Sequence, residues 1–172
     1  MRPPASPAES PRRTLAALGL SPRKSLGQNF LADPNVARKI VGLAQTHTPP
    51  FLEIGPGLGA PTDLLADAGA PVVAVEIDRG LAAHLRGRLA GTSVEILEAD
   101  FLTVPEPEWR LRFPEGGTVV GNLPYSISSP IVLRLIELRS RFHTSSFGGG
   151  SVDHSQTGRA KSCYCNESTS TG

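Results

Sequence analysis

Between residues 51 and 121 the chain alternates short apolar runs with stretches of helical periodicity, separated by short loops. The runs that could each form one strand are residues 51–54, 72–76, 94–97 and 118–121. Strands that alternate with helices in this way favour a parallel sheet covered by helices. In such sheets the carboxyl ends of the strands share one edge, where ligands bind. The sequence therefore predicts a doubly wound α/β fold with about four parallel strands.

Composition divides the 172 residues into three segments. Residues 1–20 are rich in Pro, Ala, Ser and Arg, and we expect a disordered basic arm or at most a short helix, either simply solvated or in contact with a polyanion. Residues 21–141 carry the periodic pattern, and here Asp33-Pro34 predicts the start of a helix. Residues 142–172 are rich in Ser, Thr and Gly without periodicity, so we expect a disordered tail or sequence foreign to the fold.

No segment approaches the length of a membrane span, and the apolar stretch from Leu15 to Leu20 is too short for a signal-peptide core. The spacing of Cys163 and Cys165, with no second pair, does not form a zinc framework. We therefore expect a cytoplasmic monomer that contacts no membrane and holds no metal ion.

A glycine-rich loop follows the first apolar run, and residues 55–60 satisfy the pattern G-x-G-x-x-(G/A). Gly55 and Gly57 would let the backbone turn tightly and approach a ligand. Pro56 removes an amide N–H that a pyrophosphate would need, whereas Glu53 suits a cationic ligand. These residues favour S-adenosylmethionine over a dinucleotide, with a tight turn that binds no ligand as the alternative.

Two acidic residues follow the second and third apolar runs. Glu76 is placed to accept hydrogen bonds from both ribose hydroxyls of a nucleoside cofactor. Asp100 is placed to accept one from an adenine amino group, and Ile77, Phe101 and Leu102 would form apolar walls. The alternative for each acid is an exposed residue at a strand end with no ligand.

The fourth apolar run ends in Asn122-Leu123-Pro124-Tyr125. The Asn122 side-chain oxygen and a backbone carbonyl of Leu123 or Pro124 could both accept from an exocyclic amine. The Tyr125 ring could stack on a flat base. We interpret these four residues as the catalytic group of a nucleobase amino-methyltransferase.

With residues 24–31 (Lys-Ser-Leu-Gly-Gln-Asn-Phe-Leu), the glycine loop, Glu76, Asp100 and the Asn-Leu-Pro-Tyr motif in this order, the chain resembles the ribosomal RNA adenine N6-dimethyltransferases. These are the KsgA/Dim-type enzymes, which are related to the erythromycin-resistance methylases. The resemblance runs from about Arg23 to Leu138. It implies a Rossmann-like class I S-adenosylmethionine-dependent methyltransferase fold.

The resemblance also implies a substrate and residue roles. The reaction would be N6-(di)methylation of adenosines in small-subunit ribosomal RNA, with the small ribosomal subunit as partner. Gln28, Asn29 and Leu31 would help close the cofactor site, Glu76 would hold the ribose and Asp100 the adenine. Asn122 would lie between the cofactor and the target amine.

Later elements of the family are not visible after Leu138, so we expect a chain truncated at its C-terminus. The sheet would then end at residues 118–121 with an unpaired apolar edge, and we expect low stability and aggregation. Three alternatives stay open: a cofactor- or RNA-binding remnant without catalysis, a DNA or protein amino-methyltransferase, and an NAD-dependent oxidoreductase.

Overall fold

The computed structural model describes residues 10–23, 30–31, 33–47, 49–122, 125–147, 150–153 and 161–164, without the side chains of residues 125–128 and of those after Phe142. In chain order the elements are α1 (Pro11–Ala17), α2 (Pro34–Ala44), β1 (Phe51–Ile54), α3 (Ala60–Asp67), β2 (Val72–Glu76), α4 (Arg79–Arg88), β3 (Val94–Glu98), α5 (Glu106–Arg112), β4 (Gly117–Gly121), α6 (Tyr125–Glu137), β5 (Phe142–Phe147), β6 (Gly150–Asp153) and β7 (Lys161–Tyr164).

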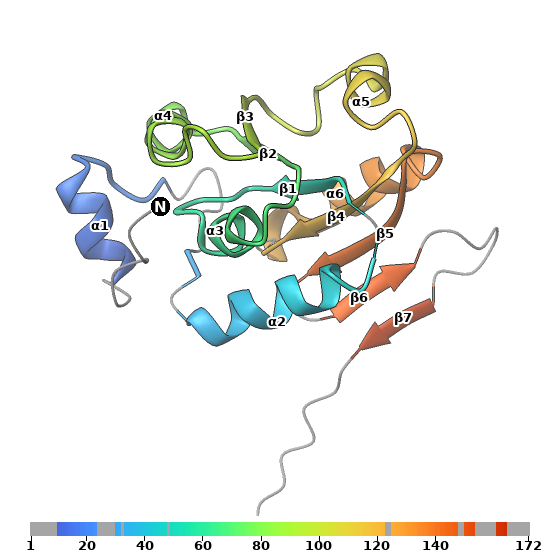
Figure 1. The fold of residues 1–172 in the computed structure, drawn as a ribbon, viewed down its shortest axis with the longest axis horizontal. Coiled ribbons are helices and arrows are strands. Elements are labelled where there is room, and N and C mark those ends of the chain that lie inside the picture. Colours follow the sequence, from blue (N-terminus) through green and yellow to red (C-terminus); the bar gives the residue numbers. More distant parts are fainter. Residues whose placement is uncertain are drawn as a thin grey trace, which may run out of the picture.

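The described strands form one sheet in the order β3-β2-β1-β4-β5-β6-β7 (Figure 1). β1 to β5 are parallel, whereas β6 and β7 are each antiparallel to the strand before them. The four strands expected from the apolar runs match β1 to β4 to within one residue at each end. The predicted doubly wound α/β fold is therefore confirmed.

The expectation that the sheet ends at β4 is wrong. β5 pairs with β4 in parallel, with Thr118 opposite Thr144 and Gly121 opposite Phe147. Residues 142–147 read Phe-His-Thr-Ser-Ser-Phe, so they show no continuous apolar run by which to recognise a strand. Pairing uses backbone N–H and C=O groups, which polar residues also carry. The unpaired apolar edge from which we predicted aggregation is therefore absent at β4.

Two helices begin at aspartate caps, and the first of them, α2, begins where Asp33-Pro34 predicted a helix start. Asp33 caps α2 by accepting a hydrogen bond from the Asn35 N–H at 2.8 Å, and Pro34 is the first helical residue. Asp78 caps α4 by accepting from the N–H groups of Gly80 and Leu81. The cap of α4 matters for function, because it directly follows the carboxyl end of β2.

Three other helices have weaker local signals. Residues 11–17 form α1, so the arm contains the short helix that was the alternative to disorder, and Leu15 of α1 is buried. α6 starts at Tyr125 and contains Pro130 in its interior, although proline is best tolerated in the first turn of a helix. α5 was not predicted, because it is only seven residues long and prolines flank it.

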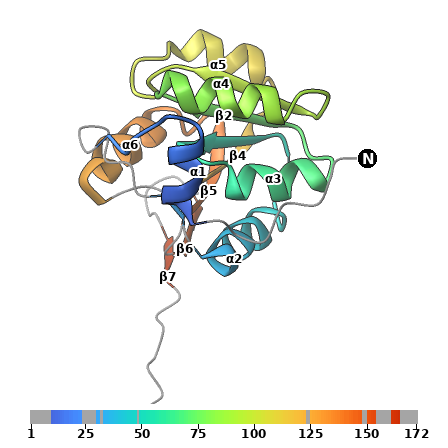
Figure 2. The same ribbon diagram turned by 90° about the vertical axis from the view of Figure 1, so that its left-hand side faces the viewer.

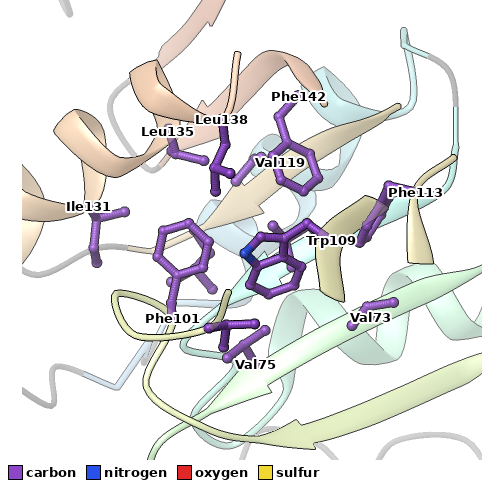
Figure 3. Close-up of a cluster of buried hydrophobic side chains, with 13 residues drawn as sticks. Val73, Val75, Phe101, Trp109, Phe113, Val119, Ile131, Leu135, Leu138 and Phe142 are labelled. Carbon is purple, nitrogen blue, oxygen red and sulfur yellow. The ribbon is translucent and has the colours of Figure 1, made fainter. Parts of the chain in front are cut away.

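Trp109 of α5 lies at the centre of the core on one face of the sheet (Figure 3). Its ring centroid is 5.6 Å from that of Phe101, 6.4 Å from that of Phe113 and 6.1 Å from that of Phe142. Apolar residues of β1, β2, β4 and α6 complete this cluster. Residues of α2, α3 and α4 form a second cluster against the other face. Both faces are therefore covered, as a parallel sheet requires.

Candidate active site

The strand register brings four predicted segments to one edge of the sheet. Ile54 at the end of β1 lies opposite Val75 of β2 on one side and opposite Gly121 of β4 on the other. Glu76 at the end of β2 lies opposite Glu98 of β3. The glycine loop, defined as residues 55–59, thus starts next to the residues that follow β2 and β4. We call this edge the carboxyl edge.

The glycine loop has a backbone that few other residues could adopt. Gly55, Gly57 and Gly59 have φ angles of 67°, 58° and 83°, in the left-handed region. A Cβ atom added at Gly57 would lie 3.3 Å from the Phe30 ring, and one at Gly59 would collide with the Arg88 side chain. A Cβ atom at Gly55 would meet nothing within 4 Å. The loop is therefore packed at its middle and end, but open at its start.

Glu76 fastens the glycine loop to β2. Its Oε2 accepts from the Gly57 N–H at 3.0 Å, and its Oε1 accepts from the Asp78 N–H at 2.9 Å. The side chain is buried, and this burial raises its pKa, although the backbone donors from Asp78 and Gly57 oppose the rise. Each carboxylate oxygen can accept a second hydrogen bond. Glu76 can therefore hold the loop and still accept from ligand hydroxyls.

Glu53 of β1 is the most perturbed acid of the described part. It is 1% exposed, and burial raises its pKa from 4.5 to about 8. The neighbouring Thr62 hydroxyl and Arg88 oppose the rise, whereas Asp63 and Glu76 add to it. Glu53 Oε2 has no hydrogen-bond partner. A protonated Glu53 is therefore the stable form at neutral pH.

This burial gives a stability prediction for Glu53→Gln. Because the unfolded chain ionises near pH 4.5 and the folded chain near 8, the folded state binds more protons between these values. The parent should lose about 1.4 kcal/mol of unfolding free energy per pH unit across this window through Glu53 alone. The Gln variant should match the parent near pH 4.5 and exceed its stability by several kcal/mol near pH 8.

Urea unfolding at a series of pH values measures this difference. The exposed Glu115 supplies a control, because Glu115→Gln removes the same charge without affecting a buried group. Parallel stability curves for the parent and the Glu53→Gln variant would show that Glu53 is ionised throughout.

The predicted adenine-binding residues follow β2 and β3. Asp100 is half-buried, and its Oδ1 accepts from the Leu102 N–H at 2.9 Å. Ile77 is 48% exposed and Leu102 38% exposed, so both can offer apolar surface at the carboxyl edge. The Phe101 ring instead packs against Trp109 in the core. Phe101 can therefore contact a ligand only through its main chain.

The remaining predicted residues are only partly described. Asn122 is half-buried and directly follows Gly121, while Leu31 is half-buried and adjoins Phe30. Tyr125 is the first residue of α6, but its side chain lies outside the described part. Gln28, Asn29, Leu123 and Pro124 lie outside the described residues.

Sequence reasoning missed Arg88 as part of this region. Its guanidinium pairs with Asp63 at 2.8 Å and donates to the Leu58 carbonyl at 2.9 Å. It therefore braces the glycine loop from α4, some thirty residues away along the chain. An arginine near a helix end carries no local signal of such a contact. Phe30 was visible only as a neighbour of the predicted Asn29 and Leu31.

S-adenosylmethionine fits the residues at the carboxyl edge. The open space at Gly55 leaves room for a ligand against the backbone. Glu76 retains acceptor capacity for ribose hydroxyls. Glu53, expected to suit a cationic ligand, is instead buried and protonated, so it offers a ligand neither surface nor charge. Pro56 offers no N–H to a phosphate. The residues therefore favour a nucleoside without a pyrophosphate over a dinucleotide.

Neither a membrane-spanning helix nor a metal-binding cluster is found among the described residues. No described helix has both the length and the apolar character needed to cross a membrane. In the same part of the chain, no group of three or more His, Cys, Asp or Glu side chains is arranged to hold a metal ion.

Comparisons with solved structures agree with the fold. The chain is similar to the 23S rRNA methyltransferase ErmE, with a TM-score of 0.59 and 38% identity over 69% of this chain and 47% of that one. It is also similar to a dimethyladenosine transferase from Plasmodium falciparum, with a TM-score of 0.56 and 27% identity over 69% of this chain and 42% of that one. The fold is therefore the predicted Rossmann-like class I methyltransferase fold.

Sequence comparisons identify the family. Ribosomal RNA small subunit methyltransferase A of Geobacter sulfurreducens is 44% identical over 130 residues, which are 72% of this chain and 46% of that protein. The protein of the same name from Koribacter versatilis is 47% identical over 128 residues, which are 67% of this chain and 45% of that protein. This chain thus spans about half the length of the curated relatives it matches.

The model of the ribosomal RNA adenine dimethylase family matches residues 19–160. This match continues past Leu138, where the resemblance was expected to end, and it includes β5 and β6. It covers well over half of the 172 residues. The chain therefore belongs to the ribosomal RNA adenine dimethylase family.

Proposed function

We propose that this chain binds S-adenosylmethionine at the carboxyl edge and transfers its methyl group to the N6 amine of adenosines in small-subunit ribosomal RNA. The observation that carries the proposal is the register that puts the glycine loop, Glu76 and Asn122 at the ends of adjacent strands. The names of the Geobacter and Koribacter relatives support the choice of ribosomal RNA as substrate.

In this proposal the cofactor lies along the ends of β1, β2 and β3. Glu76 accepts hydrogen bonds from the ribose hydroxyls, and Asp100 accepts one from the adenine amino group. The exposed Ile77 side chain covers the adenine ring, while Phe101 contributes only its main chain. Gln28, Asn29 and Leu31 close the site over the glycine loop. When bound, S-adenosylmethionine supplies an electrophilic methyl group on a cationic sulfur.

The chain's own residues would then orient the target amine. An adenine amino nitrogen is a weak nucleophile, because its lone pair is delocalised into the ring. The Asn122 side-chain oxygen and a carbonyl of Leu123 or Pro124 accept hydrogen bonds from the two N–H groups of this amine. These hydrogen bonds orient its lone pair toward the methyl group. Tyr125 stacks on the base. Each hydrogen bond contributes only ~1 kcal/mol, whereas in-line positioning can contribute ~7–11 kcal/mol.

Calorimetry with Glu76→Gln tests the cofactor site. The amide keeps the size of the side chain but replaces one acceptor oxygen by a donor, which the Gly57 or Asp78 N–H would then face. Hydrogen bonds to charged groups contribute about 1.5–3 kcal/mol, so the affinity for S-adenosylmethionine should fall roughly 10- to 100-fold. Glu98→Gln on the adjacent strand is the matched control, because Glu98 is exposed and Arg86 is its ion-pair partner among the residues that the structure describes.

Two results would contradict the proposal. Preferential binding of NAD over S-adenosylmethionine would indicate an oxidoreductase site. Binding of S-adenosylmethionine without transfer of labelled methyl groups to a ribosomal RNA hairpin, either naked or in the small subunit, would leave a cofactor-binding protein without this activity. Transfer to adenine N6, identified by mass spectrometry of digested RNA, is the expected result.

A further inference from the structure

We infer that α1 and the turn after it form a basic surface that contacts the phosphate backbone of the RNA beside the target adenosine, an inference that rests on the proposed function. The surface consists of Arg12 and Arg13 on α1, with Arg23 beyond it. α1 precedes residue 19, where the family match begins, so this surface lies mostly outside the matched region.

The contacts of the segment fix α1 at the carboxyl edge. Leu15 is 2% exposed, and the Leu20 N–H donates to the Leu15 carbonyl at 2.8 Å, which folds the turn back onto the helix. A Cβ atom added at Gly80, in the first turn of α4, would collide with the Leu20 side chain, so Leu20 packs directly there. Because α4 begins right after β2, this contact places the turn next to the cofactor site.

An ion pair makes a second attachment at the same place. The Arg23 Nε lies 3.5 Å from Asp78 Oδ2. The backbone N–H of Asp78 in turn donates to Glu76 Oε1. Figure 1 shows α1 beyond the ends toward which β4 and β5 point, next to α4. Figure 2, which faces this side of the molecule, shows α1 in front of the sheet. The arm therefore lies at the carboxyl edge, the same edge at which Asn122 follows β4.

Charge distinguishes this surface from the rest of the described chain. Residues 10–23 contain three arginines and no acid. Arg12 and Arg13 are exposed, and the structure gives them no ion pair among the described residues. By contrast, five arginines on α4, α5 and α6 pair with carboxylates, namely Arg86, Arg88, Arg110, Arg112 and Arg134. Arg79, the first residue of α4, is exposed and has no ion pair among the described residues.

Arg12 and Arg13, which are exposed and have no ion pair among the described residues, match a polyanion, whereas Arg23 pairs with Asp78 and attaches the segment. RNA is the polyanion that the proposed reaction brings to this edge. Phosphate contacts position a nucleic acid and carry no sequence information. Their formation releases counterions, so the removal of one arginine that binds a phosphate should lower the salt dependence of log Kd by about 0.7–0.9. The surface therefore predicts a specific change in salt dependence.

The double variant Arg12→Gln/Arg13→Gln tests the inference. Binding of a fluorescent RNA hairpin with two adjacent adenosines in its loop is measured between low and moderate salt. We expect the slope of log Kd against log salt to fall by about 1.5. The affinity for S-adenosylmethionine should not change, because neither arginine touches the glycine loop residues that the structure describes.

Two further double variants make the result specific. Arg110→Gln/Arg139→Gln removes the same charge from α5 and the region after α6, where both side chains are exposed, and should keep the parent slope. Arg12→Lys/Arg13→Lys keeps the charge and should also retain most of the slope. An unchanged slope for the Arg12→Gln/Arg13→Gln variant, or an equal fall for the Arg110→Gln/Arg139→Gln variant, would overturn the inference.

The same measurements separate this inference from the proposed function. If the parent chain binds S-adenosylmethionine and methylates RNA while the Arg12→Gln/Arg13→Gln variant keeps the parent's slope of log Kd against log salt, the result contradicts the basic surface and leaves the proposed function standing. A parent chain that binds S-adenosylmethionine but no RNA contradicts both the surface and the proposed transfer to RNA. A parent chain that does not bind S-adenosylmethionine contradicts the proposed function itself.

Discussion

The Asn122→Ala variant should lose methyl transfer to RNA while it still binds S-adenosylmethionine. Asn122 follows Gly121, which lies opposite Ile54, so it stands beside the start of the glycine loop. Its side chain is the acceptor assigned to the target amine, and misplacement of a reacting group by about 1 Å can cost 10²-fold in rate. We expect the rate to fall by about two orders of magnitude or more.

Two assays on each protein check this prediction: single-turnover transfer of labelled methyl groups to the RNA hairpin, and calorimetric titration with S-adenosylmethionine. Asn35→Ala is a matched control, because Asn35 is exposed on α2 and its hydrogen bonds in the described part of the chain are to Asp33 and Arg38 in the same helix turn. The control should keep both activities. Equal transfer rates for Asn122→Ala and the parent would remove Asn122 from the chemistry.

The Trp109→Ala variant should lose a large part of the stability of the domain. Trp109 is fully buried, and its ring contacts three other aromatic rings, those of Phe101, Phe113 and Phe142. Truncation of such a residue leaves a cavity and costs about 3–5 kcal/mol, which is a large part of the stability of a typical domain. Figure 3 shows the Trp109 ring among side chains of α6 and of the strands, so truncation would leave the space between them unfilled.

Urea unfolding followed by far-ultraviolet circular dichroism measures this loss. Trp109→Phe should cost less than the alanine variant, because it keeps a ring in place and removes the indole N–H, which is buried without a hydrogen-bond partner. Leu111→Ala, on the same helix but 77% exposed, should change stability by no more than about 0.5 kcal/mol. Similar losses for Trp109→Ala and Leu111→Ala would contradict the assigned core.

The candidate site was partly predictable, because its residues follow strands that the apolar runs identify. Parallel strands put their carboxyl ends at one edge, so Glu76 and Asn122 could be assigned to a common site before the register was known. Phe101 could not be assigned correctly in this way. It follows a strand as Ile77 does, yet its ring packs on Trp109, and only the position of α5 decides this.

The raised pKa of Glu53 also depends on long-range packing. A glutamate near a strand end is ordinarily solvated, but here α3 brings Thr62 and Asp63 beside it. Arg88 of α4, which donates to the Leu58 carbonyl of the glycine loop, also acts on it. The rise in pKa results from burial by these elements. No spacing along the chain encodes it.

The sequence alone determined β1 to β4, the capped starts of α2 and α4, and the left-handed glycine loop. Apolar runs, capping side chains and glycine act through the residue itself and its near neighbours. Only the tertiary structure decided that the polar residues 142–147 extend the sheet, that Trp109 centres the core and that α1 stands at the carboxyl edge. Backbone pairing and burial join residues far apart in the chain, so they leave no local pattern to read.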